Sequence, residues 1–428
     1  MSFKRRRFLR TIATIGGTSS LIPFFSTSQG QRLLKKLDSI KSFELNEVVQ
    51  NESFWYQIKN AYTVSPAIVN LNNGGVSPQP RVVQEAVERY NRMSNEAPSL
   101  FMWRTLNQGK EPIREKLADL GSCLPEEIAI NRNASEALET IIFGLPLKAG
   151  DEVVLTKQDY PNMINAWKQR AHRDGIVLKW LNLELPIEDQ QQLIDTFTSA
   201  FTAKTKVVHI THMINWVGQI LPVKEIGAIA HERGIEVLVD GAHTFAHIDF
   251  NIPDLNCDYF GASLHKWLSA PFGTGMLWVK KEKIKKIYPL FAAPEFDSDN
   301  IRKFEHLGTR SLAIEQAIGQ AVDFYHMIGT ERKEARLRYL SNYWISRVKD
   351  LPFVRIHSPQ NPQLNGAIGS FSIDGMDSRD LTNKLFKDFK IHTTGIKWEN
   401  INGVRVTPNV YTVTKDLDRL VKAIKSFG

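Results

Sequence analysis

Apolar runs with a β-rich composition alternate with stretches of helical periodicity between about residue 66 and residue 280. The runs predict seven strands, and the stretches between most of them predict helices. Because helical connections favour parallel pairing of the strands that they join, the alternation indicates an α/β unit with a mostly parallel sheet flanked by helices. The expected strands are 127–131, 152–156, 177–181, 206–211, 236–239, 258–261 and 275–279, and the clearest helices are 134–143, 164–173 and 223–233.

The pattern changes after about residue 311. Two helical stretches precede three short apolar runs, and an amphipathic stretch ends the chain. Helices followed by short strands predict a smaller α+β unit. Its helices are expected over 312–328, 332–348 and 415–426, and its strands over 354–356, 367–373 and 404–406.

The length and composition fit a multidomain globular protein. The chain has 428 residues, of which 42% are hydrophobic and 23% are charged, and this length allows two or three domains. Cys123 and Cys257 are the two cysteines, too few for a disulfide framework or a structural zinc site. After residue 28 we expect a lead-in segment over 29–65, a large domain over 66–305 and a small C-terminal domain over 306–428.

The formal net charge of +8 is concentrated at the N-terminus. Residues 1–41 hold nine of the 54 basic side chains and one of the 46 acidic ones, so the remainder carries 45 of each. A surface that follows nucleic-acid phosphates needs an excess of basic side chains. We therefore expect no nucleic-acid partner.

The N-terminus resembles an export signal. Residues 4–10 read KRRRFLR, and the uncharged stretch 11–25 that follows is too short and too weakly apolar to span a membrane comfortably. Paired arginines before Phe-Leu resemble the bacterial twin-arginine signal. We expect a signal peptide over residues 1–28 that uses the twin-arginine translocation machinery to reach the periplasm or the exterior, with cleavage and retention as an anchor both open. A disordered basic tail is the alternative.

Several familiar sites have no basis in the sequence. No Gly-x-Gly-x-x-Gly motif joins a strand to a helix, and no Walker loop is present. His243 and His247 form a His-x-x-x-His pair, but only Asp240 and Asp249 lie near as a third ligand. We therefore expect no metal site.

The informative segment is VLVDGAHTFAHIDFNIPDLNCDYFGASLHK, residues 237–266. One predicted strand ends in Asp240, and the next is followed by Lys266. Strand ends of a parallel sheet share one rim, where ligands bind in open α/β folds. A buried aspartate is costly unless it is paired with a cation, and a pyridinium nitrogen is such a cation. Since a lysine can form an imine with an aldehyde, the pair suits pyridoxal phosphate, although a helix cap and a surface lysine remain the alternative.

VDGAH followed by SLHK resembles the class V family of pyridoxal-phosphate (PLP) enzymes, which includes aminotransferases, cysteine desulfurases and isopenicillin N epimerase. The similarity extends from about Asn70 to Arg405. It implies the fold type I of PLP-dependent transferases, with PLP as the cofactor. LNNGGVSP at 71–78 and EHLGTRS at 305–311 favour the isopenicillin N epimerase-like subgroup, a name for a sequence group that does not establish penicillin chemistry.

The resemblance also implies roles for single residues. Lys266 is then the catalytic Schiff-base lysine, Asp240 the catalytic partner of the pyridine nitrogen, and His243 the contact of the phenolic oxygen. The phosphate is expected at a helix N-terminus, whose free N–H groups attract anions. Its expected ligands are Asn133, Ala134, Ser135, Ser263 and His265 of the same chain, with Gly308 and Thr309 contributed by the neighbouring subunit of a homodimer.

Three further residues are assigned by the same resemblance. Tyr160 is expected to stack on the pyridine ring and Asn215 to lie near it. Arg405 is expected to bind the substrate carboxylate as a bidentate fork. Each has an ordinary structural alternative, and so does Ser135: a helix cap for Ser135, a core aromatic for Tyr160, a turn asparagine for Asn215 and a solvent-facing arginine for Arg405.

One departure from the family separates this chain from the desulfurases. These carry a mobile cysteine before the arginine strand, whereas the matching stretch 392–398 contains none. We expect a PLP-dependent enzyme that acts at the α-carbon of an amino acid or an amino-acid-derived substrate, of the class V aminotransferase or epimerase type. A C–S or other β-lyase is the alternative, and a non-catalytic PLP-binding protein a remote one. Racemisation needs a second acid, for which Tyr160 and His306 are candidates.

Overall fold

The computed structural model describes Leu21 and residues 27–428. The signal peptide predicted over residues 1–28 therefore lies almost wholly outside the described residues. Within the described part, no helix combines the length and the apolar character that a membrane crossing requires.

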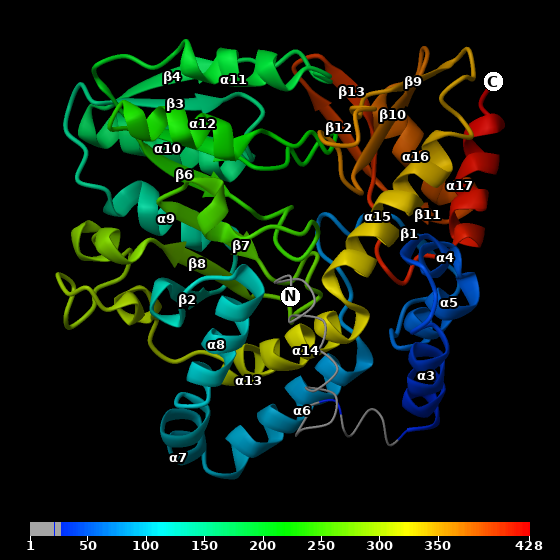
Figure 1. The fold of residues 1–428 in the computed structure, drawn as a ribbon, viewed down its shortest axis with the longest axis horizontal. Helices are drawn as coiled ribbons and strands as arrows, with labels where there is room; N and C mark the ends of the chain where they lie inside the picture. The colour runs from blue at the N-terminus through cyan, green and yellow to red at the C-terminus, as the bar shows by residue number, and fades with distance from the viewer. Residues whose placement is uncertain (1–20, 22–26) are drawn as a thin grey trace.

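Seven strands form the central sheet, in the order β2-β8-β7-β6-β5-β3-β4 (Figure 1). β8 runs antiparallel to both of its neighbours, and the other adjacent pairs are parallel. The predicted α/β class with a mostly parallel sheet is confirmed. The strands are β2 (Ile128–Asn131), β3 (Glu152–Thr156), β4 (Val177–Leu181), β5 (Thr205–Thr211), β6 (Glu236–Asp240), β7 (Tyr259–Ser263) and β8 (Gly275–Val279).

Both faces of this sheet are buried, because successive side chains of a strand point to opposite sides. Val153 and Leu155 of β3 pack with α9 (Ala134–Gly144) and α10 (Pro161–Asp174). Val154 between them belongs to the opposite core. The helices that contribute to this opposite core include α8 (Lys110–Gly121), α11 (Gln190–Thr198), α12 (Val223–Glu232) and α14 (Ile318–Ile328).

A second group of helices lies below the sheet in Figure 1. α13 (Leu312–Gln316) and α14 contact α6 (Arg81–Glu96) and α8. The helix predicted over 312–328 is interrupted at Ala317, and α6 and α8 were not predicted. The remaining elements of the large unit are α7 (Pro98–Leu100), η1 (Phe101–Leu106), η2 (Pro125–Glu127), η3 (Ile252–Leu255), η4 (Lys281–Lys286) and η5 (Ile301–Glu305).

A four-stranded antiparallel sheet, β12-β13-β10-β9, forms the C-terminal unit. Its strands are β9 (Val354–Ile356), β10 (Gly369–Ile373), β12 (Thr394–Trp398) and β13 (Ile401–Val406). Side chains of α15 (Thr330–Ile345), α16 (Ser378–Phe389) and α17 (Thr414–Lys425) build a core against them. The predicted α+β character is present, and β12 and α16 are additions to the prediction. The division at residue 306 stays a prediction.

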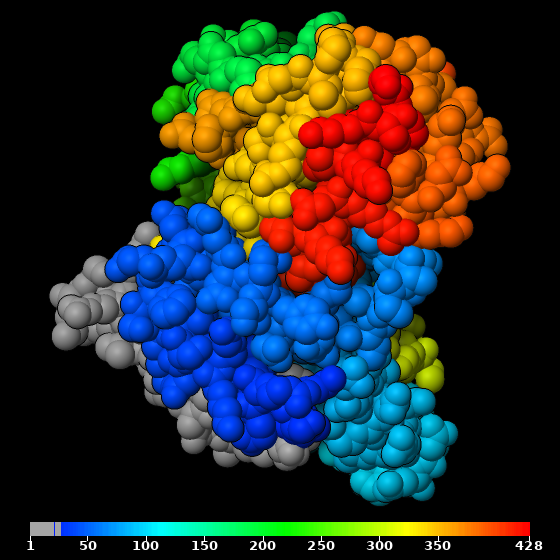
Figure 2. Space-filling model, turned by 90° about the vertical axis from the view of Figure 1, so that its right-hand side faces the viewer, coloured from blue at the N-terminus to red at the C-terminus, as the bar shows by residue number. Residues whose placement is uncertain are grey.

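Segments from the two ends of the chain lie side by side, blue beside red in Figure 2. β1 (Val69–Asn70) pairs in parallel with β11 (Ile391–His392). The lead-in segment forms α3 (Ser28–Ser39), α4 (Leu45–Gln50) and α5 (Glu52–Asn60). Arg336 of α15 donates to the carbonyl of Val49 at 2.8 Å and stacks on Trp55, with its Cζ 5.1 Å from the ring centre. The lead-in is therefore packed into the same body as the C-terminal helices.

Candidate active site

The tertiary structure brings Asp240 and Lys266 to one rim of the central sheet. Asp240 ends β6, and Lys266 follows the end of the parallel neighbour β7 by three residues. Loss of contact with bulk water lowers the pKa of Lys266 to about 8, Asp240 opposes this shift, and the charge of Arg405 adds to it. Near neutral pH the amine therefore exchanges its proton easily, as a lysine that reacts with an aldehyde must.

Asp240 is a buried carboxylate that lacks a hydrogen-bonded cation in the described chain. It is 5% exposed, and Oδ1 accepts a hydrogen bond from the N–H of Ala242 at 2.9 Å. Burial raises its pKa above the usual value, and the hydrogen bond from Ala242 and the nearby charge of Lys266 offset only part of this shift. A carboxylate in this setting is complementary to a protonated ring nitrogen. The residues at this rim therefore fit PLP.

His243 lies directly against the lysine. Its Nε2 is 3.2 Å from Lys266 Nζ, and its Nδ1 accepts a hydrogen bond from Trp267 Nε1 at 3.4 Å. Burial, together with the charges of Lys266 and Arg405, holds the pKa of His243 well below its usual value. The ring is therefore neutral over the physiological pH range.

The N-terminus of α9 forms the predicted phosphate end of the site. Asn133 caps this helix by accepting from the N–H of Glu136 at 2.9 Å, and the N–H of Ala134 donates to Ser263 Oγ at 3.0 Å. β8 passes very close: a Cβ at Gly275 would lie 2.5 Å from Asn133 Cα. Glycine at 275 thus permits the turn and the strand to approach. The helix start and the hydroxyl of Ser263 form a setting for a phosphate group.

The other two predicted phosphate ligands flank this turn. Ser135 is the second residue of α9 and is partly buried, and Asn133 rather than Ser135 caps the helix. His265 donates from Nδ1 to the carbonyl of Thr274 at 3.0 Å, which leaves Nε2 for another partner. Asn133, Ala134, Ser263 and His265 therefore come from two adjoining loops at one end of the site.

Arg405 is buried, and its solvent-facing alternative is wrong. It is 5% exposed, donates to Asn72 Oδ1 at 2.8 Å and donates to the carbonyl of Asn215 at 3.1 Å. Its Nε and the Oδ1 of Asn215 are both buried without a hydrogen-bond partner among the described residues. Burial lowers the pKa of Arg405 to about 10. Unpartnered polar atoms at this position suit a polar ligand.

Asn72 was not predicted as a site residue, although it lies in the quoted LNNGG motif. Its carboxamide reaches Arg405 on one side, and on the other Nδ2 lies 3.5 Å from His392 Nε2. Asn72 and His392 also line a groove of about 940 Å³ between α5, α17 and the segment 63–78. Asn72 therefore lies between this groove and Arg405.

Tyr160 faces the space beside the lysine. Its ring centre is 5.9 Å from Lys266 Nζ, and the residue is 41% exposed, so it is not an ordinary core aromatic. The preceding Asp159 fixes the turn by accepting from the hydroxyls of Thr156 at 3.0 Å and Thr211 at 2.7 Å. Stacking of Tyr160 on a pyridine ring stays a prediction.

Gly308 and Thr309 do not join this site within one chain. Both are exposed, and no hydrogen bond or ion pair connects them to Lys266 or Asp240 in the described residues. His306 is exposed as well, so its predicted role as a second acid has no contact that supports it. Contribution of Thr309 by a second subunit stays a prediction.

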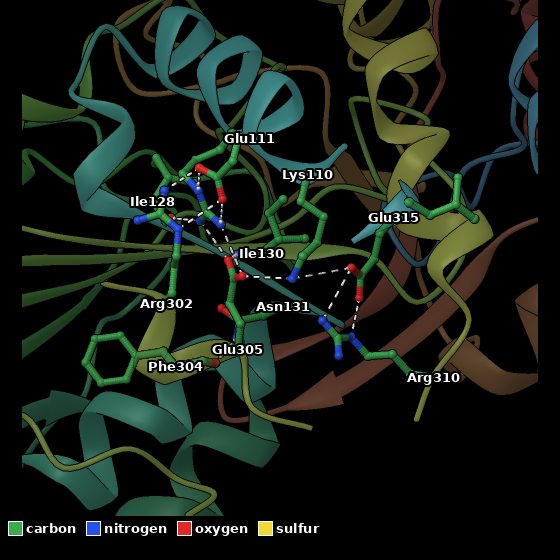
Figure 3. A network of polar contacts seen from close by, with 12 residues as sticks. Lys110, Glu111, Ile128, Ile130, Asn131, Arg302, Phe304, Glu305, Arg310 and Glu315 are labelled. Atoms are coloured by element: carbon green, nitrogen blue, oxygen red, sulfur yellow. Dashed lines mark hydrogen bonds and ion pairs between the residues drawn. The ribbon is translucent and has the colours of Figure 1, made fainter. Parts of the chain in front are cut away.

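A buried charge network anchors the segment that carries Thr309 (Figure 3). Before the segment, Glu305 binds Arg114 at 2.7 Å, Lys110 at 3.0 Å and the N–H of Ile130 at 2.7 Å. After it, Glu315 pairs with Arg310 and lies 3.9 Å from the amine of Lys110 in α8. Arg114 and Lys110 lower the pKa of Glu305 despite its burial. The two ends of the segment are thereby tied to α8 and β2.

The described residues offer neither a metal site nor an activated thiol. They contain no group of three or more His, Cys, Asp or Glu side chains arranged to hold a metal ion. Burial raises the pKa of Cys123 to about 12 and raises that of Cys257 as well. Both thiols are therefore protonated at neutral pH, whereas the thiolate is the reactive form.

Comparison with known proteins agrees with this geometry. The profile of the family "Aminotransferase class-V" matches residues 68–406. Isopenicillin N epimerase of Streptomyces clavuligerus is 28% identical over 388 residues, which cover 86% of this chain and 97% of the relative. A probable cysteine desulfurase of Synechocystis sp. is 30% identical over 341 residues, covering 75% and 80%.

A solved structure shares the fold. C-DES with glycine covalently linked to its PLP cofactor superposes with a TM-score of 0.79 at 21% identity, over 86% of this chain and 99% of that one. The predicted fold, cofactor and enzyme class are therefore confirmed. The chain belongs to the class V aminotransferase family of PLP-dependent enzymes.

Proposed function

We propose that this enzyme acts at the α-carbon of an amino acid or an amino-acid-derived substrate, as an epimerase-like or aminotransferase-type enzyme. The observation that carries the proposal is the buried guanidinium of Arg405 in the same site as Lys266. Burial lowers the pKa of Lys266 and the charge of Arg405 adds to this shift, while the Nε of Arg405 has no partner in the described chain. A carboxylate is the group that suits a desolvated guanidinium.

The residues divide the reaction between them. PLP, when bound, supplies an electron-withdrawing ring that accepts the electron pair left at Cα. Arg405 binds and orients the substrate carboxylate, with Asn72 and the carbonyl of Asn215 holding the guanidinium in place. Lys266, as a neutral amine, removes the proton from Cα. Asp240 keeps a proton on the ring nitrogen by its negative charge.

The fate of the removed proton decides the reaction. Its return to the opposite face of Cα gives the epimer, its return to a different carbon gives an amino-group transfer, and loss of a β-substituent gives a lyase. The relatives include an epimerase and probable cysteine desulfurases, so a C–S lyase is the second candidate. Against a mechanism through a protein persulfide stand the absence of cysteine from 392–398 and the raised thiol pKa values of Cys123 and Cys257.

One experiment separates these reactions. The holoenzyme is incubated in deuterium oxide with a panel of L- and D-amino acids and short peptides that carry a free α-amino acid. Exchange at Cα, inversion, keto-acid formation and thiol release are followed together. We expect Cα exchange with inversion or keto-acid formation. Thiol release with pyruvate would instead identify a β-lyase, and Lys266→Ala is the control that should abolish all four signals.

We also propose that the enzyme is a homodimer with shared sites. Thr309 is exposed, and the charge network of Glu305 and Glu315 ties both ends of its segment to the body. The class V resemblance assigns this Gly-Thr pair to the phosphate of the neighbouring subunit. A sedimentation experiment on the holoenzyme tests whether it is a dimer. Thr309→Ala should weaken cofactor binding without dissociating the dimer.

Finally, we propose export through the twin-arginine route. PLP is made in the cytoplasm, so the enzyme must fold and bind its cofactor before export. The twin-arginine route carries folded proteins, and the motif KRRRFLR is therefore consistent with a PLP enzyme. The proposal places the mature enzyme in the periplasm or outside the bacterial cell.

A further inference from the structure

His247, a buried histidine beside the site, has its protonation defined by two backbone partners. Its Nδ1 lies 2.7 Å from the carbonyl of His243, and its Nε2 lies 2.9 Å from the N–H of Ala367. A carbonyl only accepts and an N–H only donates, so Nδ1 carries the proton and Nε2 does not. Burial lowers the pKa of His247 to about 3, in agreement with a neutral ring.

The imidazole of His247, with its tautomer fixed in this way, stacks on the indole of Trp267. The two rings stack with centres 3.8 Å apart and an interplanar angle of 27°. On its backbone side, the carbonyl of Trp267 accepts a hydrogen bond from the buried amine of Lys333. Trp267 directly follows Lys266 in sequence, so both its backbone and its ring are fixed next to the reactive lysine.

The indole N–H in turn meets one nitrogen of His243. Trp267 Nε1 lies 3.4 Å from His243 Nδ1. An indole nitrogen is a donor only, so Nδ1 of His243 is the acceptor and carries no proton. The ring is neutral, because burial disfavours its charged form and the cations Lys266 and Arg405 face it. The single proton therefore resides on Nε2, which faces Lys266 Nζ at 3.2 Å. Above its pKa of about 8, Lys266 is a neutral amine that accepts a hydrogen bond from this N–H.

We propose that Trp267 is a positioning residue that holds His243 in its Nε2–H tautomer, so that this N–H points into the site as a fixed hydrogen-bond donor. The chemical group that it meets is a negatively charged oxygen of the cofactor ring, and this part rests on the proposed function. The opposite tautomer would present a lone pair to that oxygen and repel it. His247 positions Trp267 by stacking, and Trp267 in turn sets the tautomer of His243 through its indole N–H.

The test begins with the wild-type protein. Full-length protein is labelled with ¹⁵N-histidine, and long-range ¹H–¹⁵N spectra are recorded on the holoenzyme and again after removal of the cofactor. His243→Gln assigns the resonance. The cofactor-free sample is recorded at pH 9, where Lys266, with a pKa of about 8, is a neutral amine, and we expect His243 to be protonated at Nε2 in both samples. Protonation at Nδ1 in the wild type overturns the proposal, whether or not any variant folds.

A variant tests the cause. Trp267→Phe keeps a ring for the stack with His247 and removes the indole N–H, so a second tautomer of His243 should appear. The pH midpoint of the visible absorption of the holoenzyme should rise by about 0.5 to 1 pH unit, the size expected for one lost hydrogen bond. Trp278→Phe is the matched control, because its buried indole N–H binds Glu127 at 3.1 Å, outside the site.

A double-mutant comparison distinguishes tautomer control from simple packing. In the His243→Gln background, Trp267→Phe should leave the absorption midpoint unchanged, because glutamine has no tautomer to set. An equal shift in both backgrounds overturns the proposal. Amino-acid exchange at Cα, measured on the same wild-type sample, reports separately on the proposed function, since the spectra after cofactor removal do not depend on turnover.

Discussion

Asn72 and Arg405 are 333 residues apart in sequence, and their side chains meet at 2.8 Å. Asn72 belongs to the loop after β1, and Arg405 lies in β13 of the C-terminal sheet. The contact joins two parts of the chain and holds the guanidinium in one orientation. A guanidinium held in this way loses little side-chain entropy when a carboxylate binds.

Arg405→Ala should lower kcat/KM for a carboxylate substrate by about 10²-fold or more, since a charge-assisted fork contributes ~3 kcal/mol. Asn72→Ala should cost about 3- to 10-fold, because it removes one hydrogen bond to the fork. Steady-state kinetics measure both. Arg379→Ala, an exposed arginine of α16, is the control and should have no effect. Wild-type efficiency in Arg405→Ala would show that this residue does not bind substrate.

Borohydride reduction of the holoenzyme should attach the cofactor to Lys266, and peptide mapping locates it. Asp240→Ala should bind the cofactor weakly and lose nearly all Cα exchange, because no negative charge then holds a proton on the ring nitrogen. Asp240→Glu should recover part of it. An adduct on a different lysine contradicts the site, and wild-type exchange in Asp240→Ala contradicts the role of the carboxylate.

Glu305→Gln should lower the free energy of unfolding by about 3–5 kcal/mol, since Arg114 and Lys110 then lose a buried counter-ion. Denaturant unfolding of the holoenzyme measures this. Arg302→Ala is the matched control: it removes an exposed partner of Glu111 and should cost less than about 1 kcal/mol. Equal losses in the two variants would show that the network contributes no more than a surface pair.

Acid should destabilise the fold below about pH 6.5. Burial lowers the pKa of His209 and His212 to about 4, so between pH 6.5 and 4 the unfolded chain binds protons that the native chain does not. Stability is therefore present above pH 6.5 and is lost as the pH falls towards 4. Burial raises the pKa of Asp159 to about 6, so this residue alone would make the fold more stable as the pH falls from 6 towards 4.

His212→Phe should flatten this pH dependence by up to about 1.4 kcal/mol per pH unit, the value for one proton. Its ring contacts Phe250 edge-on, with centres 5.2 Å apart, so an aromatic replacement keeps the packing. Unfolding curves at pH 7, 6, 5 and 4.5 measure the slope. His172→Gln, on the exposed side of α10, is the control. An unchanged slope in His212→Phe would show that this ring titrates normally.

Replacing Arg5 and Arg6 by lysine should retain active, cofactor-loaded enzyme in the cytoplasm. The twin-arginine machinery recognises the arginine pair, and lysine keeps the charge of the segment. Cell fractionation with absorbance of the cofactor as readout decides the question. Equal periplasmic yields from both proteins would show that the N-terminus is a different kind of signal.

The alternation of apolar runs and helical stretches was sufficient to predict the α/β architecture of the large unit. Periodicity is a local property, so β3, β4 and β8 begin and end where the pattern predicts. Helices α6 and α8 were not predicted, although α6 is strongly amphipathic, and both pack against α13 and α14.

By itself, the sequence determined the α/β class, the family, the cofactor and the paired Asp240 and Lys266, since these depend on strand ends and on motifs that lie close together in the chain. The tertiary structure decided which distant residues share the site. Asn72 reaches Arg405, Trp267 meets His243, and Glu305 pairs with Arg114. Such contacts depend on side-chain direction and burial after folding, which no local pattern encodes.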